Sequence, residues 1–281
     1  ANNAYYMREK ISGADPETFE LLFDDENNIG SSGYARDKNV VYYKGKKVEG
    51  TDSSEFTIVG AGRMYVKDNN FVYSYYKAER FPDIDAKTFE YVGNFYFKDK
   101  NNVYFDGGRV FEGIDPNTFE IIGDGAYAKD KNNVWKTYYE SHGEYPASAI
   151  LMAEADTATF VFLENYYAKD RNFVYLHSWI LPDADPVSVE ILEDGYAKDK
   201  NSVYFMKEKV QGVDPATFEI IGRNYTKDKD TVYFRNKALI GLSPDSTQVF
   251  WCGYVKDKSS VYFMDQDIKL NPISGADVST F

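Results

Sequence analysis

A short phrase of the form Tyr-x-Lys-Asp-Lys-Asn-x-Val-Tyr returns eight times along the chain. Its aspartates are separated by 31, 31, 31, 40, 29, 29 and 29 residues. A fixed period of this length is typical of a stacked array or a propeller, in which each repeat packs on its neighbours. The eight aspartates are Asp37, Asp68, Asp99, Asp130, Asp170, Asp199, Asp228 and Asp257.

Each phrase predicts a β-hairpin. Tyr, Phe and Val favour strands, and the Asp-Lys-Asn at residues 99–101 favours a turn. Aspartate accepts a hydrogen bond from the backbone two residues later, and asparagine tolerates the left-handed conformation that closes a three-residue loop. Counting outward from that loop, we expect Tyr96 to face Tyr104 and Phe97 to face Val103.

The rest of the repeat predicts a small meander. A second turn at residues 44–46 or 106–108 leads into a short third strand, and an Asp-Pro pair such as Asp115-Pro116 predicts a capped turn before the next strand. Apolar residues on both faces of the hairpin predict that neighbours cover both faces. Valine recurs at one position and is expected to fill a tightly packed slot: Val41, Val72, Val103, Val134, Val174, Val203, Val232 and Val261.

These elements define an all-β tandem repeat array of antiparallel three- to four-stranded meanders. We expect one array over residues 1–281, with about eight repeats of 29–31 residues and both ends inside a repeat. A parallel β-helix is disfavoured, because the basic residue before every loop aspartate would form a ladder of like charges. An open, solenoid-like superhelix fits the mid-repeat ends. An eight-bladed propeller is the alternative, although about 40 residues per blade is usual.

Composition excludes several classes of function. The net charge of −13 repels phosphate backbones, so nucleic acid is not an expected partner. Apolar stretches fall far short of the roughly 20 residues that span a bilayer. The lone Cys252 excludes an internal disulfide. We predict no enzyme, no cofactor and no metal site, since the two histidines suggest no catalytic arrangement and the loop aspartates lack the glycine of a calcium loop.

The longest spacing marks the candidate binding surface. About ten extra residues lie between repeats four and five, within residues 136–155, and insertions in repeat proteins often form binding faces. The candidate residues are Trp135, Tyr138, Tyr139, His142 and Tyr145. Trp135, Trp179 and Trp251 also offer flat surfaces on which sugars stack. We favour the alternative interpretation that they are buried repeat contacts, because Trp135 occupies the position of Tyr104.

Two recurring phrases resemble those of a known family. They are Asp-Lys-Asn-Asn-Val-Tyr-Phe at residues 99–105 and Gly-x-Asp-Pro-x-Thr-Phe-Glu-Ile-Ile-Gly at residues 113–123. Their pairing at this spacing is similar to the bacterial DKNYY repeat family over nearly the whole chain. The resemblance implies a bacterial, often exported protein without an assigned activity, and it brings no catalytic residues.

We therefore expect a non-enzymatic structural or adhesive protein that is secreted, periplasmic or on the cell surface. It would act as a scaffold, spacer or fibre segment through protein partners or self-association. The alternative is a carbohydrate-binding module that uses the aromatics near the repeat-four insertion to bind glycans.

Overall fold

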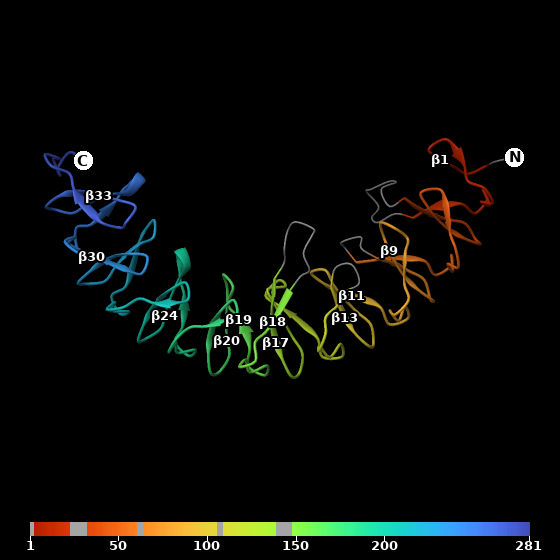
Figure 1. Cartoon of the computed structure of the whole chain (residues 1–281), viewed down its shortest axis with the longest axis horizontal. Coiled ribbons are helices and arrows are strands. Elements are labelled where there is room, and N and C mark those ends of the chain that lie inside the picture. The colour runs from red at the N-terminus through yellow and green to blue at the C-terminus, as the bar shows by residue number, and fades with distance from the viewer. Residues whose placement is uncertain (1–2, 23–32, 61–64, 106–108, 139–147) are drawn as a thin grey trace. The chain divides into compact units, whose positions relative to one another are not determined.

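The chain folds as a succession of small antiparallel sheets (Figure 1). The computed structural model describes residues 3–22, 33–60, 65–105, 109–138 and 148–281. These residues form eight four-stranded sheets and a two-stranded sheet near the N-terminus. The predicted all-β tandem repeat array of short meanders is confirmed. Two compact units, residues 1–149 and 150–281, are described separately below.

The first unit holds the two-stranded sheet and the first four-stranded sheets. Its strands are β1 (Tyr5–Tyr6) and β2 (Glu9–Lys10); β3 (Glu20–Leu21), β4 (Tyr34–Arg36), β5 (Val41–Tyr43) and β6 (Lys46–Val48); β7 (Thr57–Val59), β8 (Tyr65–Lys67), β9 (Val72–Ser74) and β10 (Arg80–Phe81); β11 (Glu90–Gly93), β12 (Tyr96–Lys98), β13 (Val103–Phe105) and β14 (Arg109–Val110); and β15 (Glu120–Ile122), β16 (Tyr127–Lys129) and β17 (Val134–Tyr138). Strand β18 (Ser148–Leu151) runs across the division between the units.

The second unit repeats the plan. Its elements are β19 (Val161–Phe162), β20 (Tyr167–Lys169), β21 (Val174–Leu176) and β22 (Trp179–Ile180); β23 (Glu190–Ile191), the 3-10 turn η1 (Glu193–Gly195), β24 (Tyr196–Lys198), β25 (Val203–Phe205) and β26 (Glu208–Lys209); β27 (Glu219–Gly222), β28 (Tyr225–Lys227), β29 (Val232–Phe234) and β30 (Lys237–Leu239); and β31 (Gln248–Val249), the 3-10 turn η2 (Trp251–Gly253), β32 (Tyr254–Lys256), β33 (Val261–Met264) and β34 (Leu270–Pro272).

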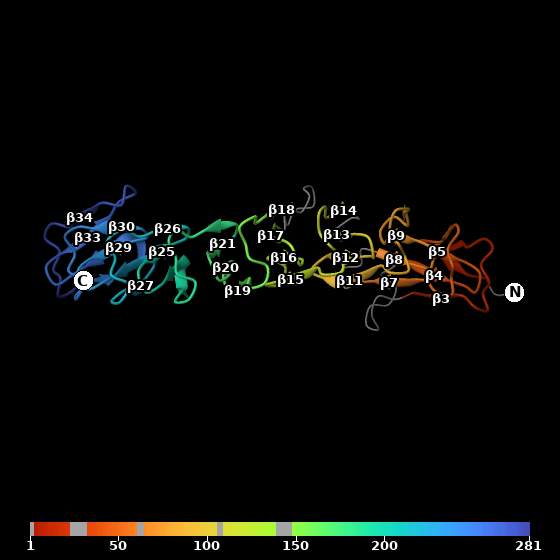
Figure 2. The same cartoon turned by 90° about the horizontal axis from the view of Figure 1, so that it is seen from below.

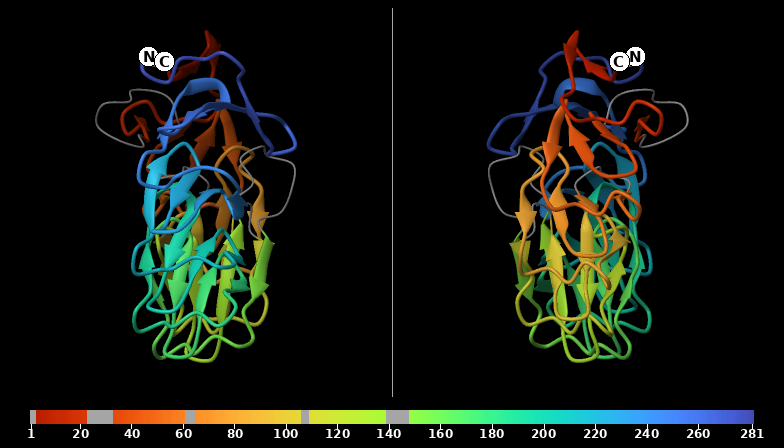
Figure 3. Two further views of the ribbon diagram at one scale, coloured as in Figure 1. Left: turned by 90° about the vertical axis from the view of Figure 1, so that its left-hand side faces the viewer. Right: turned by 90° about the vertical axis from the view of Figure 1, so that its right-hand side faces the viewer.

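Strand order within each four-stranded sheet follows the chain. Figure 2 shows β11, β12, β13 and β14 side by side in that sequence, and their pairing is antiparallel throughout. The views from either end show the same short strands and tight turns (Figure 3). Because every strand pairs with its neighbour in sequence, each sheet needs only local contacts to form.

The predicted hairpin register is wrong by one residue. Tyr96 pairs with Phe105, and Phe97 pairs with Tyr104. The loop has four residues, 99–102, and it is closed by the Asp99 N–H, which donates to the Asn102 carbonyl at 3.0 Å. None of these four residues has a positive φ, so no left-handed asparagine is needed. A shift of one residue moves a side chain to the other face of a sheet, since side chains alternate along a strand.

The corrected register separates the two tyrosines of each repeat. Tyr104 packs with Tyr65 of the preceding sheet, in a cluster that also contains Phe97. Tyr96 and Val103 instead face the following sheet, where Trp135 belongs to the same cluster. Both faces of a sheet are therefore buried against neighbouring sheets, as the sequence predicted.

The same arrangement recurs in both units. In the second unit, Tyr196 and Val203 cluster with Tyr233 of the next sheet, and Tyr167 clusters with Tyr204. The valine slot is confirmed, because all eight valines are at most 1% exposed. A constant residue size at this position fits the close packing of protein interiors, where a gap or an extra methylene lowers stability.

The remaining turns follow the predicted chemistry. Lys44 and Gly45 have φ values of 48° and 76°, as a two-residue hairpin turn of the type I′ requires; the copy at residues 106–108 lies outside the described residues. Asp115 caps its turn by accepting the Asn117 N–H at 3.0 Å, and its carbonyl accepts the Thr118 N–H at 3.2 Å. None of the described residues forms a helix with the length and apolar character that a membrane crossing needs.

Candidate binding site

The repeated aspartate organises each hairpin loop from the inside. In the third repeat, Oδ1 of Asp99 accepts the N–H groups of Asn101 and Asn102, both at 2.8 Å. Oδ2 accepts the Tyr104 hydroxyl at 2.9 Å and the Asp85 N–H at 2.8 Å. This side chain is 2% exposed, and four donors satisfy it. A buried carboxylate is stable only when it is hydrogen-bonded in this way.

In the first repeat, burial and hydrogen bonding have opposite effects on the pKa of the loop aspartate, Asp37. Burial alone would raise the pKa of Asp37, but the N–H groups of Asp15 and Asn39 and the Tyr42 hydroxyl together hold that pKa below its usual value. Burial and the bond to Asp37 raise the pKa of Tyr42 to about 12. The tyrosine therefore stays protonated and donating throughout the physiological range.

This network is an Asx turn with a tyrosine added, and it uses the aspartate oxygens that a cation would need. The structure places no three His, Cys, Asp or Glu side chains together as a metal site within the residues it describes. The predicted backbone contact two residues after the aspartate is present in all eight loops, at 2.7–2.9 Å.

Trp135 lies inside the molecule. It pairs with Ala128 across β16 and β17, as Tyr104 pairs with Phe97, so it does occupy the tyrosine position. Its side chain is 7% exposed, and its ring lies edge-on to Phe111 with 6.1 Å between centroids. A buried ring offers no open face to a sugar. Since an indole ring has no hydroxyl, Asp130 also lacks the bond that Tyr104 gives to Asp99.

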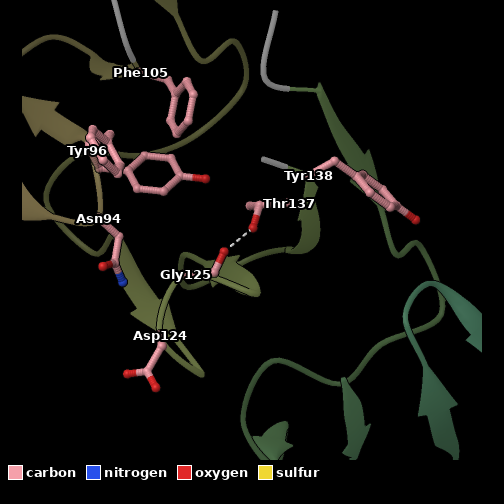
Figure 4. A pocket seen from close by; sticks show the side chains of 8 residues that line it. Asn94, Tyr96, Phe105, Asp124, Gly125, Thr137 and Tyr138 are labelled. Atoms are coloured by element: carbon pink, nitrogen blue, oxygen red, sulfur yellow. Dashed lines mark hydrogen bonds between the residues drawn. The ribbon is translucent and has the colours of Figure 1, made fainter. Parts of the chain in front are cut away.

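Tyr138 lines a small hollow of about 160 Å³ between the sheets β11–β14 and β15–β18. Figure 4 shows the rings of Tyr96 and Phe105 on one side and Thr137, whose hydroxyl donates to the Gly125 carbonyl, on the other. The ring of Tyr138 points away from Tyr96. The other candidate residues, Tyr139, His142 and Tyr145, lie outside the described residues, so that part of the surface stays a prediction.

Lys136 is a buried cation that the sequence analysis missed. It is 3% exposed, and its Nζ donates to the carbonyls of Ala126 and Thr137. The ammonium also lies 5.2 Å from the ring centroid of Tyr127 and 4.7 Å from that of Tyr138. Burial lowers its pKa to about 8.

The repeat alignment contains the signal for this lysine. Lys136 pairs with Tyr127 at a register position that five other sheets fill with apolar side chains, namely Phe105, Leu176, Phe205, Phe234 and Phe263. A charge at a mostly apolar position marks a departure from the packing rule of the array.

A second and larger hollow of about 560 Å³ lies in the other unit, between the sheets β19–β22 and β23–β26. It occupies the equivalent place between two sheets: Asn165 and Tyr166 stand where Asn94 and Phe95 line the first hollow, and each hollow is also bordered by an Asp-Gly pair, at residues 194–195 and 124–125. Its lining residues are Asn165, Tyr166, Tyr167, Leu176, His177, Trp179, Asp194, Gly195, Met206 and Lys207.

Trp179 is the exposed aromatic that an aligned sequence would have singled out. It pairs with Leu176 at the start of β22, where the corresponding residues are Lys46, Arg109, Glu208 and Lys237. The last sheet has Asn271 there, so the position is polar in each of these sheets. A tryptophan at such a position faces solvent, and Trp179 is 49% exposed. The expectation that the tryptophans are buried thus fits Trp135 but not Trp179, nor Trp251, which is 77% exposed.

The fold and its repeated Asx-tyrosine loops define a tandem β-repeat protein. The chain belongs to the DKNYY family, whose sequence model matches residues 1–142 and 136–266. Comparison with curated proteins gave no match, and comparison with solved structures gave none.

Proposed function

We propose that this chain is a non-enzymatic structural or adhesive protein, acting as a scaffold, spacer or fibre segment through protein–protein contacts. The location proposed for it is outside the cytoplasm of a bacterium, either secreted, periplasmic or on the cell surface. The proposed location rests on the resemblance of the repeated phrases to a family of bacterial, often exported proteins.

The observation that carries the proposal is that the recurring polar side chains join one repeat to the next. Lys98 donates to the Pro116 carbonyl at 3.3 Å, and Lys169 donates to the Pro186 carbonyl at 2.8 Å. Both carbonyls belong to the capped turn that connects one four-stranded sheet to the next. Side chains used in this way stabilise an array, which is the property that a scaffold or spacer needs.

Glutamates that recur at one position of the repeat, on the first strand of a sheet, support the same proposal. Each lies exposed on the first strand of its sheet and forms an ion pair with the basic residue of the second strand, such as Glu90 with Lys98 at 3.3 Å. Exposed pairs of this kind contribute little stability, about 0–1 kcal/mol. They keep a strongly acidic surface hydrated, which favours solubility. The set is Glu20, Glu90, Glu120, Glu190 and Glu219.

The proposal can be tested with the purified full chain. Sedimentation over a concentration series should show reversible self-association, or surfaces coated with the chain should retain beads coated with a defined bacterial or host surface protein. A panel of polysaccharides and casein should show no release of reducing ends or amines. Turnover that disappears when a single glutamate is changed to glutamine would contradict the proposal.

A further inference from the structure

The exposed rings of Trp179 and Tyr166 form an ordered aromatic cluster with His177. Tyr166 stacks on His177 with 4.8 Å between ring centroids and 22° between their planes. Trp179 meets His177 edge-on at 6.1 Å and 87°. Tyr166 is 55% exposed. Rings held against one another in this way lose little conformational freedom when a ligand binds, which favours affinity.

The cluster borders a hollow of small-molecule size. Its volume of about 560 Å³ falls within the range of roughly 300–1,000 Å³ that is usual for such sites. Apolar lining comes from Leu176 and Met206, while Asn165 and Asp194 add an amide and a carboxylate. An exposed ring beside a few polar groups suits a ligand that has both an apolar face and hydroxyl groups.

Charge narrows the class of ligand. The ammonium of Lys207 lies 4.5 Å from the ring centroid of Trp179, so a cationic ligand would be repelled from that ring. Asp194 and the net charge of −13 disfavour an anionic ligand. A neutral ligand remains. The C–H groups on the face of a pyranose ring carry partial positive charge and match the negative face of an aromatic ring.

We propose that this hollow, lined by Trp179, Tyr166, His177, Asn165 and Asp194, is a binding site for neutral hexopyranose units of a polysaccharide. Trp179 and Tyr166 stack against the sugar rings, and Asn165 and Asp194 accept hydrogen bonds from the hydroxyl groups. The proposal goes beyond the structural role, because the rings of Tyr166, in the turn before β20, and Trp179, at the start of β22, are exposed and are not among the fully buried side chains of the array. Loss of sugar binding would leave the array itself intact.

The turn that carries Tyr166 provides a substitution expected to fold. Tyr166 has a φ of 65°, a conformation that asparagine adopts more readily than tyrosine. Asn224 occupies the equivalent position between β27 and β28 with a φ of 64°. Tyr166→Asn therefore removes the ring without disturbing the turn. Trp251 is the matched control, since it is an exposed tryptophan that does not line the hollow.

The test titrates the full chain with neutral hexasaccharides of β-1,4-glucose, α-1,4-glucose and β-1,4-N-acetylglucosamine, followed by tryptophan fluorescence and calorimetry. At least one should bind, and Trp179→Ala should weaken that binding at least about tenfold, or about 1.4 kcal/mol. Tyr166→Asn should weaken it by about threefold or more, as the loss of one aromatic contact predicts. Trp251→Ala should leave it within about twofold.

Circular dichroism and thermal unfolding of each variant establish that the fold is retained. The proposal is overturned if none of the three sugars changes the fluorescence or releases heat at about 10 mM, where even a weak site is partly filled. It is also overturned if Trp251→Ala weakens binding as much as Trp179→Ala does. The acidic hexasaccharide hexagalacturonate is titrated in the same way as a charged comparison. If it binds more tightly than the neutral sugars, the assignment of a neutral ligand is wrong.

Discussion

The hydroxyl of Tyr104 donates a hydrogen bond of 2.9 Å to Oδ2 of Asp99, five residues earlier and across the hairpin loop. The tyrosine ring meanwhile packs against the preceding sheet. One side chain thus fixes the loop and fills the contact between repeats. All eight loops lie within the described residues, and in six of them the tyrosine hydroxyl donates to the loop aspartate at 2.8–3.3 Å.

Asp99→Asn should destabilise the chain more than Asp130→Asn. An asparagine amide would turn a donor toward the Asp85 N–H and the Tyr104 hydroxyl, at an expected cost of about 2–4 kcal/mol. The fourth loop lacks the hydroxyl, because Trp135 replaces the tyrosine, so the cost at Asp130 should be smaller by about 1 kcal/mol. Urea unfolding of both variants measures the difference. Equal losses would show that the tyrosine hydroxyl contributes nothing.

Trp135→Ala should lower the free energy of unfolding strongly, because the ring of Trp135 is buried. Removing a large aromatic from a packed contact costs about 3–5 kcal/mol. Trp135→Tyr restores the hydroxyl partner of Asp130 and should stay within about 1.5 kcal/mol of the natural chain. Trp251→Ala, at an exposed position, should change stability by less than about 0.5 kcal/mol. Thermal unfolding checks the order, and a harmless Trp135→Ala would contradict the burial of this ring.

Lys136→Met should stabilise the chain at pH 7, by about 1–3 kcal/mol. The pKa of Lys136 is lowered to about 8 in the folded state, below its ordinary 10.5. Between these values the unfolded chain binds a proton that the folded chain lacks, so stability of the natural chain rises with pH. The advantage of Lys136→Met should therefore shrink from pH 8 to pH 10.

Lys131→Met is the control for that titration. Its hydrogen bond and ion pair with Asp115 raise the pKa of Lys131, so it stays charged through the same interval. The effect of Lys131→Met should not change between pH 8 and pH 10, as measured by urea unfolding. An advantage of Lys136→Met that is constant with pH would mean that Lys136 does not titrate there.

Removal of whole sheets tests how the repeats are coupled. If each sheet packs only on its neighbours, deleting the residues of β31–β34 and then those of β27–β30 should lower the unfolding midpoint in steps. The remaining sheets should keep their β-sheet circular dichroism. Collapse on loss of a single sheet is the result expected of a closed ring.

Small-angle X-ray scattering distinguishes the two predicted architectures, an open array and a closed propeller. An open array should give an elongated particle, and one whose length grows with concentration would also support end-to-end association. A closed eight-bladed propeller should give a compact particle whose dimensions do not change with concentration.

The local structure within each repeat was predictable from the sequence. Strand residues, the loop aspartate with its contact two residues on, the existence of a second turn at residues 44–46 and the valine slot all follow from the conformational preferences of these side chains. The register was not, because a loop of three residues and a loop of four are both compatible with the same letters. Hydrogen bonds from two successive N–H groups to Asp99 select the longer loop.

The candidate site was only partly predictable. Tyr138 does line a hollow, but the ring of Trp135 is buried, and its position in the repeat already favoured burial. Trp179 was grouped with Trp135, whereas its place at a register position of polar residues puts it on the surface. Tyr166, His177 and Trp179 all belong to the sheet β19–β22, but their contact depends on how its turns bring different strands together, and the order of residues along the chain does not show that.

The sequence by itself determined the period, the all-β class and the residue types of each strand, because these depend on local preference and on repetition. Only the tertiary structure decided which face each tyrosine takes, which tryptophan is buried and where a lysine is forced out of water. Those outcomes depend on the packing of one sheet against the next, and a one-residue change of register reverses the face of every side chain on a strand.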